Sequence, residues 1–319
     1  MVFKRLLGAI GVGGPSVDTV LDGGAVLPGG ALSGEVRLRG GGAAVEIEAI
    51  GLELIARVEA EHEEGESEGS VVFERYVVGG GFRLDAEEER SVPFTITVPW
   101  ETPVTELYGQ PLGVVLGLRT ELAVAGARDR GDLDPVAVRP LPVQEAVLEA
   151  LGQLGFGFHS ADLEYGRIGG TGQRLPFYQE IELTPPPRYA HAVTEIELTF
   201  LATPSDLEVV LEADKRGGHD ALTRFTVRHE DAPVLDWNSE VDGWIRRLTE
   251  HREAYGAQSY VHSTPHSEHG SGMGMGAAVA AGAAGLAVGV VGGMVAAEVV
   301  DEIGDFFEDE DQEESGEED

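Results

Sequence analysis

Short runs of alternating hydrophobic and polar residues recur along the first 138 residues of the chain. In one of them, Phe94, Ile96 and Val98 alternate with two threonines. An alternation with a period of two places successive side chains on opposite faces of a β-strand, so that one face is buried. Repeated half-buried strands with no helical pattern between them predict an antiparallel β-sandwich over residues 1–138.

The run from Val45 to Leu54 changes its parity part-way. Val45 and Ile47 occupy odd positions, whereas Ile50, Leu52 and Leu54 occupy even ones. A single extra residue in one strand of an antiparallel pair produces such a shift. The sequence therefore predicts one long strand here that contains a β-bulge.

A connector is predicted from Asp129 to Pro142, because it contains the turn-forming sequence Asp132-Leu-Asp-Pro135 and two further prolines. Beyond it, hydrophobic residues with helical spacing predict a helix near 143–154, which Gly155 would terminate. Alternating runs resume between about 181 and 227, and a second short helix is expected near 238–249. We therefore predict a second antiparallel β-sandwich with two helices over residues 139–250.

The last 69 residues have a different composition. Residues 251–269 are rich in Ser, Gly and His and predict a linker. Residues 270–300 form a Gly/Ala-rich segment with small residues every fourth position, among them Ala281, Gly285, Gly289 and Gly293. On a helix these residues form one smooth ridge, a glycine zipper, that another backbone can approach closely. Residues 301–319 form an acidic tail that we expect to be disordered.

Three roles are open for the glycine-zipper segment: self-association or docking on the body, membrane association, and a disordered linker. A helix of this length could cross a bilayer, but Leu286 is its only leucine, and basic and aromatic flanks are missing on its N-terminal side. We therefore favour self-association or docking. In the acidic tail, Phe306 and Phe307 are candidates for a short docking motif.

Charge limits the classes of partner. The 319-residue chain has a net charge of −35, which repels phosphate backbones and favours cationic partners, so we expect no nucleic-acid binding. It has no cysteine, which excludes disulfides, thiolate catalysis and thiolate metal sites. The apolar stretch at the N-terminus is too short for the core of a signal peptide. A cytoplasmic location is expected, with membrane association possible only through residues 270–300.

Two kinds of motif could carry catalysis or phosphate binding, but both lack the surrounding elements that this chemistry requires. Gly65-Glu-Ser-Glu-Gly69 matches the nucleophile-elbow pattern, but acidic residues surround it and no helical pattern follows. Glycine clusters such as Gly169-Gly-Thr-Gly172 lack the strand, the helix and the lysine of a phosphate loop. We therefore predict no catalytic residue and no cofactor-binding residue, and we expect no cofactor.

Histidines and carboxylates raise the question of metal binding. His251, His262, His266 and His269 lie close together beside acids, but their spacing is irregular. The pairs Glu180 with Glu182, and Glu195 with Glu197, would each lie on one face of a strand. The solvent face of an alternating strand explains these pairs, and no metal ligand is predicted.

Several segments, in this order, resemble one known family, the bacterial sporulation-control proteins of the SpoOM type. These segments are Gly8–Thr19, Pro28–Gly40, Val92–Pro99, Asp132–Pro135, Leu154–Phe158, Leu175–Glu182 and Leu211–Gly218. The resemblance covers roughly residues 1–250. It implies an arrestin-like build with two sandwiches, and it brings no catalytic residues to this chain.

The fold expected is mainly β: two tandem antiparallel, arrestin-like β-sandwich domains with a few short helices, a Gly/Ala-rich helical segment and an acidic tail. The resemblance implies a non-enzymatic regulatory or scaffold protein that acts through protein–protein contacts with an unnamed partner. Phe177 and Tyr178 are predicted as an apolar contact patch, although core packing would also explain them. The alternatives are a membrane-associated structural or cytoskeletal adaptor and, more remotely, a metal-dependent hydrolase.

Overall fold

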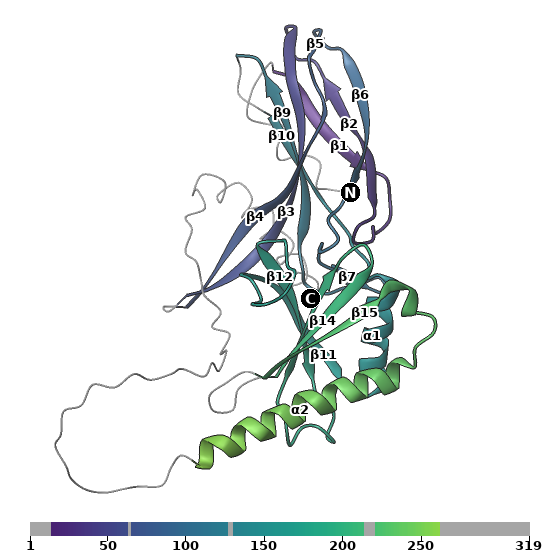
Figure 1. Ribbon diagram of the computed structural model, residues 1–319. Helices are drawn as coiled ribbons and strands as arrows, with labels where there is room; N and C mark the ends of the chain where they lie inside the picture. Colours follow the sequence, from purple (N-terminus) through teal and green to yellow (C-terminus); the bar gives the residue numbers. More distant parts are fainter. Residues whose placement is uncertain (1–13, 63–64, 127–129, 214–220, 262–319) are drawn as a thin grey trace, which may run out of the picture.

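The computed structural model describes residues 14–62, 65–126, 130–213 and 221–261 (Figure 1). The strands in these ranges are β1 (Ser16–Leu21), β2 (Ala31–Arg39), β3 (Val45–His62), β4 (Gly65–Gly79), β5 (Phe82–Leu84), β6 (Glu89–Thr97), β7 (Glu106–Leu107), β8 (Gln110–Pro111), β9 (Leu116–Val124), β10 (Arg130–Pro135), β11 (Gly157–Tyr165), β12 (Phe177–Thr184), β13 (Ile196–Ala202), β14 (Asp206–Ala213) and β15 (Ala221–Arg228). The helices are α1 (Pro142–Gln153), the short 3₁₀-helix η3 (His229–Asp231) and α2 (Trp237–Val261). The predicted mainly β class with few helices is confirmed.

The first half of the chain is a two-layer β-sandwich. One layer is the sheet β1-β2-β6, and the other consists of β10, β9 and β3, with β4 and β5 also paired to β3. The layers meet where the Thr19 N–H donates to Asp132 Oδ2 at 2.6 Å and the Thr19 and Thr120 hydroxyls lie 2.6 Å apart. The inward side chains, such as Phe94 and Ile96, are buried as the alternation predicts.

Two local predictions in this half had different outcomes. The bulge in the long strand is confirmed by register shifts between Ile47 and Ala49 and between Ile50 and Gly51. The turn prediction for Asp132–Pro135 is wrong, because these residues belong to β10, which pairs with β9. Since β10 is an edge strand and Pro135 is its last residue, the missing proline N–H costs little in the ladder.

Strand β3 joins the two halves. In this strand of 18 residues, Ile47–Ala56 pair with β9 in the sandwich and Ile50–His62 pair with β4. Near its C-terminal end β3 meets β11 in parallel at Glu59 and Glu164. The larger sheet therefore continues through β3 from the sandwich into the second half, in the order β10-β9-β3-β11-β12-β13-β14-β15. Figure 1 shows β3 and β4 running down from the sandwich to β12.

The second half contains five antiparallel strands, β11 to β15, together with the helices α1 and α2. Helix α2 packs on β14 and β15 and against α1, and Trp244 of α2 stacks on Phe225 of β15 with ring centroids 4.8 Å apart. Helix α1 is found where the first helix was predicted, and Gly155 follows it with a φ of +93°, as a C-terminal cap requires.

Helix α2 is longer than the predicted helix at 238–249, because it continues to Val261 through part of the predicted linker. Residues 250–261 contain good helix formers such as Arg252 and Ala254, and the first proline beyond them is Pro265. Within the described residues, no helix is both long and apolar enough to cross a membrane. The glycine-zipper segment at 270–300 and the acidic tail at 301–319 lie outside the described residues.

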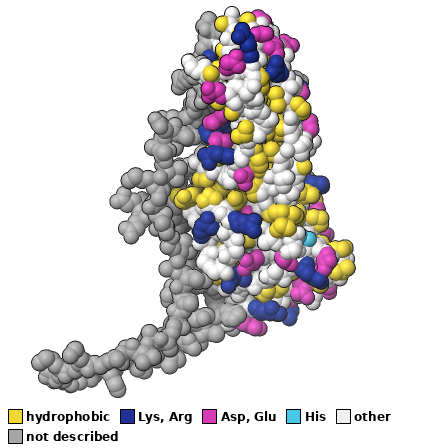
Figure 2. Space-filling view, turned by 45° about the horizontal axis from the view of Figure 1, so that its top comes forward, with side chains coloured by type: hydrophobic (Ala, Val, Ile, Leu, Met, Phe, Trp, Pro, Cys, Tyr) yellow, Lys and Arg dark blue, Asp and Glu magenta, His cyan; other side chains and the backbone are white. Residues whose placement is uncertain are grey.

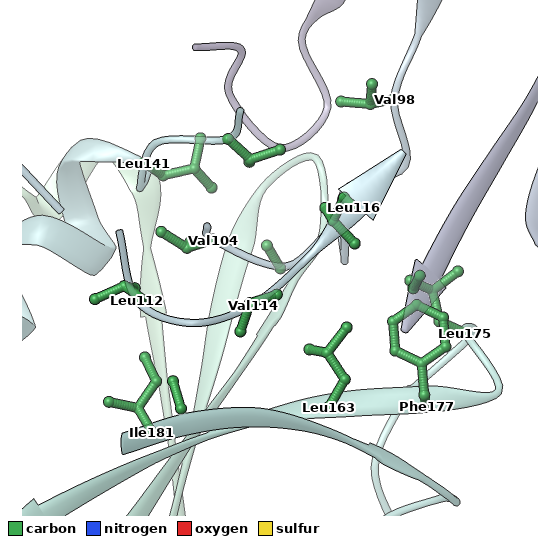
Figure 3. Close-up of a cluster of buried hydrophobic side chains, with 14 of the residues drawn as sticks. Val98, Val104, Leu112, Val114, Leu116, Leu141, Leu163, Leu175, Phe177 and Ile181 are labelled. Carbon is green, nitrogen blue, oxygen red and sulfur yellow. The ribbon is translucent and has the colours of Figure 1, made fainter. Parts of the chain in front are cut away.

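A shared hydrophobic core lies where the halves meet (Figure 3). Val104, Leu112 and Val114 come from the first half, whereas Leu163 and Ile181 come from β11 and β12. All five are at most 9% exposed. This continuous core fixes the second half against the sandwich.

Candidate functional site

An open groove of about 530 Å³ runs along one side of the sandwich, where β4 and β6 lie beside each other without pairing. Its lining is Tyr76, Val77, Val78, Pro93, Phe94, Thr95, Ile96 and Thr97. None of these side chains carries a charge at neutral pH, in a chain of which 25% is charged. In Figure 2, exposed hydrophobic side chains likewise gather along the N-terminal half, with charged side chains around them.

The outer edge of β6 forms one wall of this groove. The Val98 N–H donates to Gly30, and the Glu88 carbonyl accepts from Gly40, so the even-numbered residues of this strand direct their backbone groups toward β2. In an antiparallel ladder the alternate residues then point their backbone groups outward. Thr95 and Thr97 are such residues, and β6 pairs only with β2 among the described strands.

The β4 wall combines one hydrogen bond with one exposed apolar side chain. The Tyr76 hydroxyl donates to the Thr97 carbonyl at 2.6 Å. Burial, and secondarily the nearby Glu74 carboxylate, raise the pKa of Tyr76 to about 12, so the hydroxyl keeps its proton at neutral pH. Val77 is 77% exposed beside it. The groove thus offers an apolar side chain and outward-pointing backbone groups side by side.

A second candidate is the face of the β11–β15 sheet opposite the helices. Cross-strand pairing aligns Asp162 with Glu180, and Glu182 with Glu197 and then Glu212. This acidic face is a product of the strand alternation, because the intervening residues of the same strands form the apolar core on the helix side.

Burial and neighbouring charge shift the protonation of this face. Desolvation, followed by repulsion from Glu197, Asp162, Glu164 and Glu212, raises the pKa of Glu180 to about 9. Burial, followed by the neighbouring glutamates of this face, raises the pKa of Tyr178 far above its usual value. At neutral pH Glu180 is therefore mostly protonated and can donate a hydrogen bond, whereas an ordinary glutamate only accepts.

The residues predicted as a contact patch lie in different environments. Phe177 is 1% exposed and packs edge-on against Phe73, with ring centroids 5.5 Å apart. It is a core residue, as the alternative interpretation held, and offers no contact surface. Tyr178 lies on the acidic face and is half-buried. The other predicted contact residues, Ala281, Gly285, Gly289, Gly293, Phe306 and Phe307, lie outside the described residues.

Comparison with known proteins identifies the family. A family model described as SpoOM protein matches residues 3–217. The chain belongs to the SpoOM family. Over 215 residues, it is 35% identical to the sporulation-control protein Spo0M of Bacillus subtilis (strain 168), an alignment that covers 67% of this chain and 81% of the relative.

The crystal structure of Spo0M from Bacillus subtilis is similar, with a TM-score of 0.66 and 29% sequence identity. The match covers 76% of this chain and 100% of that one. Together these findings confirm the SpoOM resemblance that the sequence motifs predicted, and they agree with the arrestin-like β-sandwich fold of the SpoOM family.

Sequence reasoning missed the groove and one histidine. Pro93 inside an alternating run is a signal for an edge strand, since proline is confined to edges and bulges. That signal points to β6 but says nothing of the neighbouring β4. His159 was not singled out, because a bulge in β11 changes which side chains share a face, and no parity shift in the sequence reveals it.

Proposed function

We propose that this SpoOM-family chain is a non-enzymatic regulator of the sporulation-control type that acts by binding a partner protein. The observation that supports this most directly is the uncharged groove beside the outer edge of β6. Edge strands are commonly protected by charged side chains that prevent pairing with another chain. The groove lining has no charged side chain, so this edge remains competent to accept a strand at Thr95, although the neighbouring Pro93 has no N–H to offer.

The partner chemistry follows from the groove walls. The outward N–H and C=O groups of Thr95 would pair with the backbone of an extended segment, which would join the sheet as an additional strand beside β6. The Thr97 carbonyl already accepts from Tyr76, so the pairing would be centred on Thr95. Val77 would contact an apolar side chain of the segment. The occupant is therefore an uncharged, β-forming segment of another protein.

A cross-linking experiment tests this proposal. The chain has no cysteine, so Thr95→Cys provides a unique attachment point for a photoreactive label, and Val234→Cys provides a matched one in the other half. Val77 and Val234 are 77% and 73% exposed. Val77→Glu would place a charge in the groove, and Val234→Glu would add the same charge elsewhere.

We expect the label at position 95 to cross-link to a short uncharged segment of one partner, identified by mass spectrometry. Val77→Glu should abolish this product, and Val234→Glu should leave it unchanged. The proposal fails if labels at 95 and 234 capture the same proteins, or if Val77→Glu has no effect. Cross-links between two copies of this chain would replace the partner proposal with self-association through β6.

A further inference from the structure

Three potential metal ligands from neighbouring strands converge at one end of the acidic face. They are His159 of β11, Glu182 of β12 and Glu195, which directly precedes β13. His159 Nε2 lies 3.9 Å from Glu182 Oε2, and one ligand atom from each of the three side chains lies within 4.8 Å of the others. The group thus combines one imidazole with two carboxylates.

A β-bulge brings His159 to this position. Phe158 pairs with Leu183 and Ser160 pairs with Glu182, so His159 is the extra residue between two adjacent partners on β12. Without the bulge, His159 and Ser160 would point to opposite faces of the sheet. With it, the Ser160 hydroxyl donates to Glu182 Oε2 while His159 approaches the same oxygen. Bulges often redirect a side chain toward a functional site.

We propose that His159, Glu182 and Glu195 bind a divalent transition-metal ion of the Zn²⁺ class. Imidazole and carboxylate together suit Zn²⁺, whereas Ca²⁺ and Mg²⁺ prefer oxygen ligands throughout. Ligand atoms around tetrahedral Zn²⁺ are about 3.3 Å apart, so the three side chains must close by a small rotation. The His159 side chain is 64% exposed and has room to rotate. Water would complete the coordination.

The surroundings favour a cation. Glu197 pairs across the sheet with Glu182, and Glu212 pairs in turn with Glu197, so carboxylates continue from the site along the acidic face. A surface with charge of one sign raises the local concentration of ions of the opposite sign. The Ser160 hydroxyl orients Glu182, as hydrogen bonds from outer residues orient the ligands of known metal sites.

Calorimetric titration of the full chain with ZnCl₂ tests this site. His159→Asn and Glu182→Gln each remove a ligand but retain polar side chains of similar size. His191→Asn, also at an exposed histidine, is the matched control. A fourth variant replaces His251, His262, His266 and His269 with Asn, because that segment has a composition suited to metal binding. Thermal melts establish that every variant folds.

We expect one Zn²⁺ ion bound in the wild type, with at least a tenfold lower affinity in His159→Asn and in Glu182→Gln. Ser160→Ala should lower the affinity about tenfold, as the loss of outer hydrogen bonds does at other metal sites. His191→Asn and the fourfold variant should retain this site. The inference is overturned if the wild type binds no Zn²⁺, if His159→Asn binds it unchanged, or if the fourfold variant alone loses it. Since Val77→Glu leaves these ligands intact, it should not alter Zn²⁺ binding, which separates this result from the partner proposal.

Discussion

The side-chain amide of Gln179 pairs with both backbone groups of Val104, as a neighbouring strand would. Gln179 Oε1 accepts from the Val104 N–H at 2.9 Å, and Gln179 Nε2 donates to the Val104 carbonyl at 2.8 Å. Both residues are buried, Val104 to 1% exposure and Gln179 to 8%. This contact ties the segment before β7 to β12, and therefore the first half to the second.

Gln179→Leu should destabilise the protein by about 2–4 kcal/mol, because two buried backbone groups lose their partner and leucine cannot replace it. Chemical denaturation measures the difference in unfolding free energy. Gln110→Leu, at an exposed position in β8, should change it by less than about 0.5 kcal/mol. Equal effects of the two substitutions would show that the Gln179–Val104 contact adds little to stability.

Glu53 should be the most important carboxylate in the sandwich for stability. Its side chain is 9% exposed, and it joins Arg75 of β4, at 2.7 Å, to Arg119 of β9, at 2.9 Å. Glu53→Gln should cost about 1–3 kcal/mol, because Arg119 is largely buried and loses its charged partner.

The comparison for Glu53 is Glu35→Gln at the more exposed pair with Arg37, which should cost clearly less stability because water screens exposed ion pairs. Both variants are compared with the wild type by denaturation at neutral pH and constant salt. If Glu35→Gln costs as much as Glu53→Gln, burial does not determine the strength of these ion pairs.

The raised pKa of Glu180 predicts that the stability of the folded protein depends on pH. Its folded-state pKa of about 9 lies above the ordinary value of 4.5, so the folded protein binds more protons than the unfolded chain between these two values. The stabilising contribution of Glu180 to the unfolding free energy is therefore complete below about pH 4.5, and it is lost as the pH rises toward 9. Glu180→Gln removes this titration and should gain stability relative to the wild type as the pH rises.

The measurement is the unfolding free energy of both proteins from pH 5 to 8, over which their difference should change by more than about 1 kcal/mol in favour of Glu180→Gln. Glu149→Gln, at an exposed position on α1, should give a curve parallel to that of the wild type. Parallel curves for Glu180→Gln would mean that Glu180 titrates normally in the folded protein.

We also expect the glycine-zipper segment to mediate self-association. Gly285→Leu together with Gly289→Leu would fill the ridge, which depends on close approach of small residues. The native mass measured by light scattering should then fall to that of one chain, as it should when residues 270–319 are deleted. Ala287→Leu, off the ridge, should preserve the larger mass. A wild-type mass of one chain would contradict the prediction.

Local patterns in the sequence predicted the strands well, but could not predict which strands meet. Phe94 and Ile96 are buried as their alternation requires, and the parity change after Ile47 identified a real bulge. The pairing of Gln179 with Val104 joins residues 75 positions apart, and no local pattern contains it. Phe177 shows the same limit, because alternation identifies two faces of a strand without saying what covers each of them.

Since β3 pairs with strands of both halves, cutting the chain at residue 138 would not give two independent domains. A fragment beginning at residue 139 would uncover β11 where it meets β3 at Glu164, and would lack Val104 opposite Gln179. We expect such a fragment to aggregate, because an uncovered strand edge invites pairing with other chains. In protein engineering, the two halves should therefore be transplanted, fused or truncated only as one module.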